Sequence, residues 1–190
     1  MGMKYTELEI AEGKHLGQPM RGSCPIEKWY PHARHSDVHI NFDKITDFVW
    51  VGSVPITLAD MDLIKKEGFQ AILDLCGDQS QESQWASRRD IKFLHEFVHD
   101  GYSPTQAQFK RIVSWIAEQT RAAKMVYIHC HAGAGRAPTV AAAYLIAAHG
   151  ETVENALAIL RARRRCHIVS QRQILGLNTF HASKLTKCHT

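Results

Sequence analysis

The sequence predicts a single-domain α/β fold with a central, mainly parallel sheet flanked by helices. Apolar segments of strand length alternate along the chain with segments in which apolar residues recur at helical spacing. Capping residues and glycines mark where several of those helices begin and end. The chain has 190 residues, of which 45% are hydrophobic, so it can bury a full core without disulfide bonds. In open sheets of this kind ligands bind at the carboxyl ends of the strands, so functional residues are expected in the loops that follow strands.

Three strands are expected in the first half of the chain, at residues 45–51, 69–75 and 91–97. A helix between the first two strands begins at Thr57, where Asp60 three positions later approximates a capping box. Gly68 ends that helix, because glycine adopts the backbone conformation that terminates helices. This order of strand, helix and strand is typical of a parallel sheet.

The second half of the chain is expected to be mostly helical. Ser103 and Gln106 predict a capping box, with Pro104 at the first helical position. The apolar stripe of that helix consists of Phe109, Ile112, Val113 and Ile116. The other expected elements are a strand at 125–128, helices at 136–149 and 153–164, and a last helix opened by Ser170 and Gln173.

The strand at 125–128 leads into the most informative part of the sequence. His129 and Cys130 follow it, and Arg136 stands at the start of the next helix. The loop between them consists of His131, Ala132, Gly133, Ala134 and Gly135. The backbone N–H groups of such a loop can turn inward and bind a phosphate dianion, and the arginine adds a fork for two phosphate oxygens. The same positive field favours the thiolate of Cys130, so the pattern predicts phosphate monoester hydrolysis through a phosphocysteine. The alternative is a buried core cysteine before a glycine-rich turn.

A histidine before the cysteine and an arginine five residues after it make this segment resemble the signature loop of the cysteine-dependent dual-specificity phosphatases. The resemblance covers about residues 43–185. It implies a protein-tyrosine-phosphatase-like sandwich, no cofactor, and protein substrates that carry phosphotyrosine, phosphoserine or phosphothreonine. Residues 43–190 are therefore expected to form the catalytic domain. Residues 1–42, which contain several glycines and prolines, are expected to form an irregular segment that packs on it.

One position departs from the usual pattern of that family. Ala137 follows the arginine, where most members carry a serine or threonine whose hydroxyl stabilises the departing thiolate. Residues 135–138, Gly-Arg-Ala-Pro, resemble the loop of plant-type glucan phosphatases, and Thr139 lies too far along the helix to substitute. We expect a slow second step, with phosphoglucan or another non-protein phosphate as an alternative substrate and a phosphate-binding pseudophosphatase as a further alternative. The candidate rings for stacking on a glycan are Trp29, Tyr30, Trp85 and Tyr102, and simple packing is the alternative for each.

Asp100 is the candidate general acid, which would protonate the departing oxygen. It precedes Cys130 by 30 residues, and its loop follows an apolar strand and precedes a helix. The layout Asp-x-x-x-Pro also resembles the acid loop of the family. The alternative is a solvated turn aspartate, because Asp-Gly is a common turn dipeptide. Weaker candidates for the acid are Asp78, Asp90 and Glu96.

The sequence also predicts roles for three further residues, His129, His131 and Cys76. The resemblance implies that His129 holds the shape of the loop and helps to keep the thiolate ionised, while His131 lies at the rim and contacts substrate or faces solvent. The run His-Cys-His does not predict a zinc site, because a structural zinc needs four ligands and no second pair has suitable spacing. Cys76 resembles the position of a cysteine in a related lipid phosphatase that bonds to the nucleophile on oxidation. A reversible disulfide between Cys76 and Cys130 is therefore expected under peroxide. The alternative is that Cys76 is only a small buried residue at the end of a strand.

Composition narrows the function further. The net charge of +4 suits an anionic substrate, a phosphorylated protein or a phosphoglucan, and no nucleic-acid motif accompanies it. The densest basic run, residues 161–165, either pairs with a helix end or forms a secondary anion site. No apolar run approaches the roughly 18 residues of a membrane span, and the N-terminus lacks an apolar signal segment. Five cysteines without framework spacing indicate a reducing compartment, so a cytoplasmic location is expected, whereas the oligomeric state is left open.

Overall fold

A computed structural model of the chain describes residues 40–77, 80–164 and 166–185. One five-stranded sheet has the order β1-β2-β5-β3-β4. Its strands are β1 (Phe42–Lys44), β2 (Val49–Ser53), β3 (Phe69–Asp74), β4 (Lys92–His95) and β5 (Met125–Cys130). Only β1 pairs antiparallel, with β2, and the other pairs are parallel. The predicted α/β fold with a mainly parallel central sheet is therefore confirmed.

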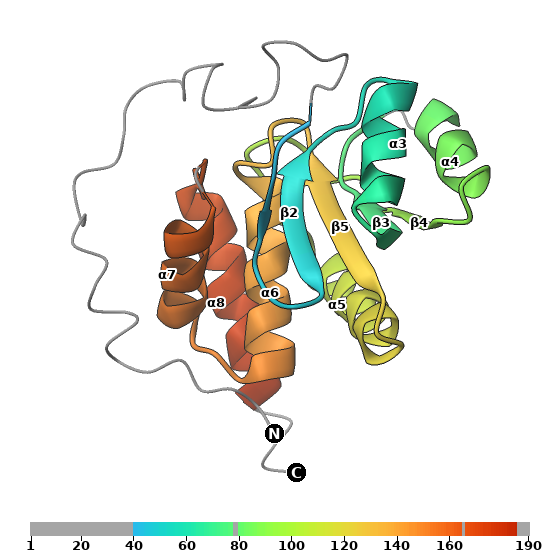
Figure 1. Ribbon diagram of the computed structural model, residues 1–190. Coiled ribbons are helices and arrows are strands. Elements are labelled where there is room, and N and C mark those ends of the chain that lie inside the picture. Colours follow the sequence, from blue (N-terminus) through green and yellow to red (C-terminus); the bar gives the residue numbers. More distant parts are fainter. Residues whose placement is uncertain (1–39, 78–79, 165, 186–190) are drawn as a thin grey trace.

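Helices cover both faces of the sheet (Figure 1). Those of the described residues are α3 (Leu58–Lys66), α4 (Ser80–Ser87), α5 (Gln106–Arg121), α6 (Arg136–His149), α7 (Val153–Arg163) and α8 (Gln171–Leu185). Helices α3 and α4 lie on one face, and the other four lie on the opposite face with α6 packed against the sheet. None of the described helices has the length and apolar character needed to cross a bilayer.

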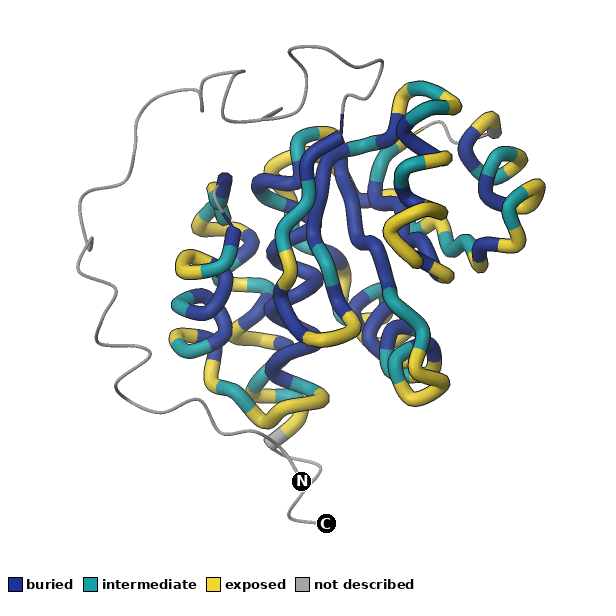
Figure 2. The backbone as a smooth tube through the Cα atoms, viewed as in Figure 1, coloured by how far each residue is buried: buried dark blue, intermediate teal, exposed yellow. Residues whose placement is uncertain are grey.

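Each face of the sheet has its own hydrophobic core, and Figure 2 shows the central strands as its most buried part. The larger core joins the sheet to α5, α6, α7 and α8, and it includes Leu73, Ile128 and Leu145. The smaller core lies under α3 and α4 and contains Phe69 and Tyr127, whose rings meet edge to face at 5.3 Å. Because β5 is covered on both faces, the residue at its carboxyl end is held by packing on both sides.

The structure corrects three sequence-based expectations about secondary structure. Residues 45–51 are not one strand, because a turn closed by Thr46 Oγ1, which accepts the Val49 N–H at 3.0 Å, separates β1 from β2. Helix α4 lies in a polar stretch for which no helix was expected. The capping box of α5 is formed by Thr105 with Gln108, so this helix begins two residues later than the Ser103–Gln106 pattern indicated.

Two expected capping boxes are confirmed. In α3 the side chain of Thr57 accepts the backbone N–H of Asp60, whose carboxylate accepts the Thr57 N–H. In α8 the backbone N–H of Ser170 donates to Gln173 Oε1 at 2.8 Å, and the Gln173 N–H donates to Ser170 Oγ at 3.3 Å. The second capping box matters for the site described below, because Gln173 also contacts the loop that carries Asp100.

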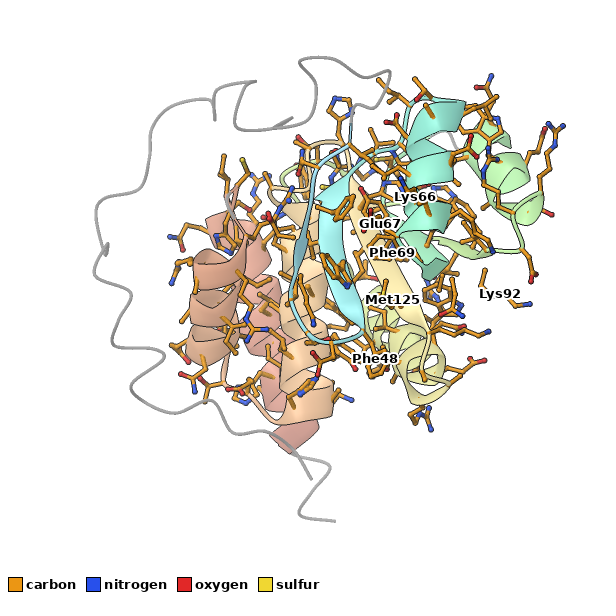
Figure 3. The ribbon with its side chains drawn as sticks, viewed as in Figure 1. Phe48, Lys66, Glu67, Phe69, Lys92 and Met125 are labelled. Carbon is orange, nitrogen blue, oxygen red and sulfur yellow. The ribbon has the colours of Figure 1, made fainter. Side chains whose placement is uncertain are left out.

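The parallel strands all run toward the same edge of the sheet. Figure 3 labels residues near the opposite edge, where strands begin: Phe48 precedes β2, and Phe69, Lys92 and Met125 open β3, β4 and β5. Cys130 is the last residue of β5 and lies in register with Ser53, the last residue of β2. The cysteine therefore stands at the carboxyl edge, where ligands bind in sheets of this type.

Candidate active site

The loop from His131 to Gly135 joins Cys130 at the end of β5 to Arg136 at the start of α6. Its carbonyl groups are held from outside by neighbouring elements. The carbonyl of His131 accepts the N–H of Val54 at 3.0 Å, and that of Ala134 accepts the N–H of Ile168 at 2.7 Å. Because the N–H of the next residue points opposite to a carbonyl across each peptide plane, these contacts turn the following amides toward the inside of the loop.

Arg164 holds the middle of the same loop. Its Nε donates to the carbonyl of Gly133 at 3.1 Å, and its Nη2 donates to the carbonyl of Ala132 at 3.2 Å. The guanidinium also donates to Asn41 Oδ1, and it pairs with Asp43 at 2.8 Å. Its side chain is only 1% exposed. Arg164 therefore fixes two more loop carbonyls outward and connects the loop to the strand at the edge of the sheet.

Gly133 must be a glycine for this loop to close. Its φ is +67°, a conformation that residues with a Cβ rarely adopt. A Cβ at this position would also lie 2.2 Å from the carbonyl oxygen of Gly52 and 2.6 Å from Arg164 Nη2. The loop thus rests directly on the backbone of β2.

Cys130 and Arg136 are both almost buried, with 3% and 6% exposure. Nη1 of the arginine donates to the carbonyls of Val98 at 3.0 Å and Leu75 at 3.3 Å, so the guanidinium plane is fixed from behind. Its Nε is buried without a hydrogen-bond partner among the described residues. The edge formed by Nε and Nη2 is the one that can hold two oxygens of a phosphate.

Asp100 reaches the same edge of the arginine. Its Oδ1 lies 3.1 Å from Arg136 Nη2, while its side chain is 89% exposed. Two contacts with the start of α8 hold its loop: Ser170 Oγ donates to the carbonyl of Gly101 at 2.9 Å, and Gln173 Nε2 donates to the carbonyl of Tyr102 at 3.2 Å. The structure therefore brings the candidate acid to Arg136, across 36 residues of sequence.

The other acid candidates lie in different settings. Glu96 pairs with Arg111 at 2.7 Å, and the hydrogen bond from that arginine lowers the pKa of the carboxyl group. A carboxyl group held in its ionised form is a poor proton donor. Asp90 sits in the turn after α4 with a φ of +53°, and Asp78 lies outside the described residues.

The structure describes two of the four candidate aromatic rings, and they lie in different settings. Tyr102 is 52% exposed beside the acid loop, with the guanidinium of Arg172 4.8 Å from its ring centroid. Trp85 belongs to α4 and packs against the smaller core, in agreement with the packing alternative given for this ring. Trp29 and Tyr30 lie outside the described residues. Of the two candidate rings that the structure describes, only Tyr102 lies on the loop that carries Asp100.

The two histidines around the nucleophile differ sharply. His131 is exposed, and only its backbone is fixed. His129 is completely buried between two carboxylates: Glu82 Oε1 lies 2.8 Å from its Nε2, and Asp74 Oδ1 lies 3.6 Å from its Nδ1. Burial by itself would lower the pKa of His129, but the charge and hydrogen bond of Glu82, followed by the charge of Asp74, raise it overall.

One group among the described residues brings three metal-binding side-chain types together. Asp74, Cys76 and His129 place one possible ligand atom each within 4.8 Å of one another. Asp74 already accepts the Cys76 N–H at 2.7 Å, and His129 already pairs with Glu82. Because three atoms fall short of the four ligands of a closed zinc site, we interpret this cluster as a network of charges and hydrogen bonds.

Cys76, the candidate redox partner, is a free, half-buried thiol that lies just past the end of β3. Strand β3 pairs with β5, and Asp74 is in register with His129. Cys76 and Cys130 therefore lie at the carboxyl ends of neighbouring strands. Burial, followed by the negative charge of Asp74, raises the pKa of the Cys76 thiol well above its usual range. The disulfide between the two cysteines remains a prediction.

Two residues that shape the site, Arg164 and Glu82, were not singled out from the sequence, and Gln173 was expected only as part of a capping box. Arg164 was seen only as part of a basic run interpreted as a helix end or an anion site, whereas its side chain is buried and holds the loop. Its neighbour Arg163 donates to the carbonyl of Ile45 at 2.6 Å. Nothing in the local sequence marks Glu82, because its partner His129 lies 47 residues away.

Comparison with known proteins agrees with this geometry. The family described as the dual specificity phosphatase catalytic domain matches residues 49–182. A Rattus norvegicus protein named phosphatidylglycerophosphatase and protein-tyrosine phosphatase 1 is 37% identical over 147 residues, which cover 74% of this chain and 76% of the rat protein. The Drosophila melanogaster dual specificity protein phosphatase Mpk3 is 31% identical over 106 residues, 55% of this chain but only 25% of that protein. A Castanea sativa phosphoglucan phosphatase is 26% identical over 148 residues, 70% of this chain and 38% of that protein.

Solved structures show the same fold. The active form of Tk-PTP has a TM-score of 0.69 and 28% identity, and the match covers 74% of this chain and 96% of Tk-PTP. PTPMT1 in complex with PI(5)P has a TM-score of 0.71 and 21% identity, over 77% of this chain and 98% of PTPMT1. The family match covers more than half of the sequence and includes the Cys130–Arg136 loop. The chain belongs to the dual specificity phosphatase family and is a cysteine-dependent phosphatase.

Proposed function

We propose that the chain hydrolyses phosphate monoesters in two steps through a phosphocysteine on Cys130, without a metal ion. The observation that supports this most directly is the arrangement around the loop of residues 131–135. Its carbonyls are held outward, the nucleophile lies at its start, and Arg136 closes it with Asp100 3.1 Å away. Such an arrangement stabilises the charge that develops on a phosphoryl group in the transition state.

In the first step the Cys130 thiolate attacks phosphorus, so that an S–P bond forms as the ester P–O bond breaks. The inward amides of the loop and the Nε–Nη2 edge of Arg136 bind the three non-bridging oxygens. Asp100 gives its proton to the departing oxygen, which leaves as an alcohol or phenol. In the second step water attacks phosphorus, Asp100 takes a proton from it, and the S–P bond breaks to return the thiolate.

The second step is the one that Ala137 affects. The side chain at this position is a buried methyl group and cannot donate a hydrogen bond to the departing thiolate. The nearest hydroxyl along the helix, that of Thr139, donates to the carbonyl of Gly135 at 2.8 Å and is therefore engaged. Breakdown of the phosphocysteine is accordingly the slow step of the proposed cycle.

The roles of Cys130 and Asp100 are separable by experiment. Cys130→Ser is expected to abolish turnover while inorganic phosphate still binds. Asp100→Asn is expected to lower kcat/KM, which reports the first step, by about 10²–10⁴-fold on alkyl phosphates, with a much smaller effect on an aryl phosphate whose leaving group needs no proton. Turnover by Cys130→Ser, or an equal effect of Asp100→Asn on kcat/KM for both kinds of ester, would contradict the mechanism.

Phosphorylated proteins are the proposed first class of substrate. Support comes from the family itself and from relatives whose names include protein phosphatase or protein-tyrosine phosphatase. A cytoplasmic site of action belongs to this proposal, because the five cysteines of the sequence lack the spacing of a disulfide framework. We also propose that residues 43–190 form the catalytic unit, to which residues 1–42 are attached.

A phosphate attached to a lipid is the second candidate, because exposed apolar side chains stand in three segments that contact the loop or Arg136. Ile168 donates its N–H to the carbonyl of Ala134, Ile56 lies two residues after Val54, which contacts His131, and Tyr102 lies two residues after Asp100. These three side chains are 55%, 57% and 52% exposed. Exposed apolar side chains in these segments fit a substrate whose phosphate is joined to apolar chains. The rat relative's name, phosphatidylglycerophosphatase and protein-tyrosine phosphatase 1, points the same way.

The substrate class is tested by kcat/KM on three substrates with one preparation: a phosphotyrosine peptide, phosphatidylglycerophosphate in vesicles, and solubilised phosphoglucan. Replacing Ile56 and Ile168 with serine should reduce activity on the vesicles selectively if the lipid is the substrate. A clear preference for the peptide, unaffected by these two changes, would establish a protein phosphatase. A preference for phosphoglucan would instead assign Tyr102 to glycan stacking.

A further inference from the structure

Two buried carboxylates flank the imidazole of His129, one from each of two neighbouring elements. Glu82 comes from α4 and lies 2.8 Å from Nε2, while Asp74 ends β3 and lies 3.6 Å from Nδ1. The exposed fractions of the His129, Asp74 and Glu82 side chains are 0%, 0% and 4%. Two ionised carboxylates in such a place require a nearby positive charge.

A protonated imidazole ring would supply that charge. A neutral imidazole has one N–H, so it would turn a lone pair toward one of the two carboxylates, whereas an imidazolium presents an N–H to each. Glu82 is the closer partner and makes the hydrogen bond, whereas Asp74 also accepts the Cys76 N–H at 2.7 Å. Among the described residues, the other titratable or charged groups near the ring, or near Asp74 and Cys76 beside it, are Cys76, His95, Tyr127, Cys130 and Arg136. None of these five can replace Glu82. His95 and Arg136 carry no negative charge, burial raises the pKa of Cys76 and of Tyr127 and so favours their neutral forms, and Cys130 is the group whose ionisation the ring would control.

We propose that Glu82 is a positioning residue that keeps His129 protonated and thereby sets how much of Cys130 is thiolate. His129 directly precedes Cys130 at the end of β5, so a cationic ring adds to the positive field of the phosphate loop. This inference rests on the proposed function in one respect, that Cys130 is the nucleophile. It adds a residue on a separate helix, which touches neither substrate nor Cys130, to the control of that nucleophile.

The placement of α4 then matters for reactivity. Arg89, just after this helix, donates to the carbonyl of Trp85 at 3.1 Å and pairs with Asp62 of α3 at 2.6 Å. These contacts join α4 to α3, while Ala86 packs in the smaller core. Helix α4 is thus fixed against the sheet in a position that directs Glu82 toward His129.

The test is the pH dependence of alkylation of Cys130 by iodoacetamide, which is uncharged and reacts with the thiolate. The alkylated peptide is followed by mass spectrometry in buffer with EDTA. Glu82→Gln keeps the size of the side chain and removes its charge. Its midpoint is expected to rise by about one pH unit, which slows alkylation about tenfold below the midpoint. Glu67→Gln is the matched control, because it makes the same substitution at an exposed carboxylate just after α3 and should leave the midpoint unchanged.

A second measurement observes the protonation of the ring directly. The imidazole ¹⁵N shifts of His129 in the wild-type protein at pH 7 are expected to be those of an imidazolium, and in Glu82→Gln those of a neutral ring. A neutral ring in the wild-type protein, or a midpoint in Glu82→Gln that is unchanged or lower, would overturn the proposal. Because alkylation does not require turnover, an absence of phosphatase activity would refute the proposed function without affecting this result.

Discussion

Replacing Arg164 with methionine tests whether the contacts that hold the phosphate loop are needed for phosphate binding. Methionine keeps most of the apolar stem and removes the guanidinium. The lost contacts are the hydrogen bonds to Ala132 and Gly133, the bond to Asn41 and the ion pair with Asp43. The arginine side chain is 1% exposed and that of its aspartate partner 12%, so this is a buried pair.

Removing one partner of a buried pair costs about 3–5 kcal/mol of the free energy of unfolding. For a protein of this length each kcal/mol corresponds to a change in Tm of about 2–4 °C, so Tm should fall by about 6–20 °C. The affinity for phosphate should fall as well, because two loop carbonyls lose their charged donor and the following amides are no longer held inward. If one charge-assisted hydrogen bond is lost from the bound state, about 1.5–3 kcal/mol, the affinity falls by about 10–150-fold.

The assay combines urea denaturation with isothermal titration of inorganic phosphate, at a temperature where the variant is folded. Arg163→Met is the matched control, because Arg163 is the last residue of the same helix and donates to the carbonyl of Ile45, in the turn between β1 and β2. It should lower stability while leaving phosphate affinity unchanged. Wild-type phosphate affinity in Arg164→Met, together with a stability loss below about 1 kcal/mol, would refute the assigned role of Arg164.

Three further predictions concern the loop and its neighbours. Gly133→Ala should abolish phosphate binding and lower stability by at least about 1–3 kcal/mol from backbone strain alone, since φ is +67° and a Cβ would meet a β2 carbonyl at 2.2 Å. Gly135→Ala, with φ of −119° and a nearest neighbour at 3.2 Å, should retain binding, and equal losses in both would contradict the loop geometry. Ala137→Ser should speed breakdown of the phosphoenzyme in burst kinetics, and an unchanged burst amplitude and turnover would remove the explanation for the slow second step. Peroxide should produce a Cys76–Cys130 disulfide, detected in non-reducing peptide maps. The disulfide should form faster at higher pH, because burial raises the pKa of Cys76. Sulfinic acid on Cys130 with Cys76 still reduced would exclude this disulfide.

Local patterns were sufficient for much of the fold. The capping boxes at Thr57 and Ser170 and the short apolar strand before Cys130 were readable from sequence, because each depends on residues within a few positions of one another. The division of residues 45–51 between two strands was not readable. The turn there depends on Thr46 Oγ1 and on pairing with distant β5, whereas the apolar residues alone resemble a single strand. Helix α4 was missed because its sequence is polar and only its packing on the smaller core stabilises it.

The candidate site could likewise be predicted from the sequence only in part. Cys130 and Arg136 were recognisable as a pair because one loop carries both, and the loop has a fixed length. The candidate acid was placed by its position after a strand, and its 3.1 Å contact with Arg136 depends on α8 holding its loop. Arg164 could not be distinguished from the other arginines of its run, because only the tertiary structure shows which of them is buried.

The groups that hold the phosphate loop and those that would bind phosphate are different residues. Amides of residues 131–135 and one edge of Arg136 face the substrate, but the carbonyls behind them are held by Arg164 and by backbone groups of two other loops. A loop of small residues has little rigidity of its own, because glycine loses more conformational freedom on ordering than any other residue. Its shape must therefore be imposed from outside, and here the charged support is buried where substrate cannot reach it. Substitutions at such positions should change phosphate affinity and nucleophile reactivity without changing any group that contacts the substrate.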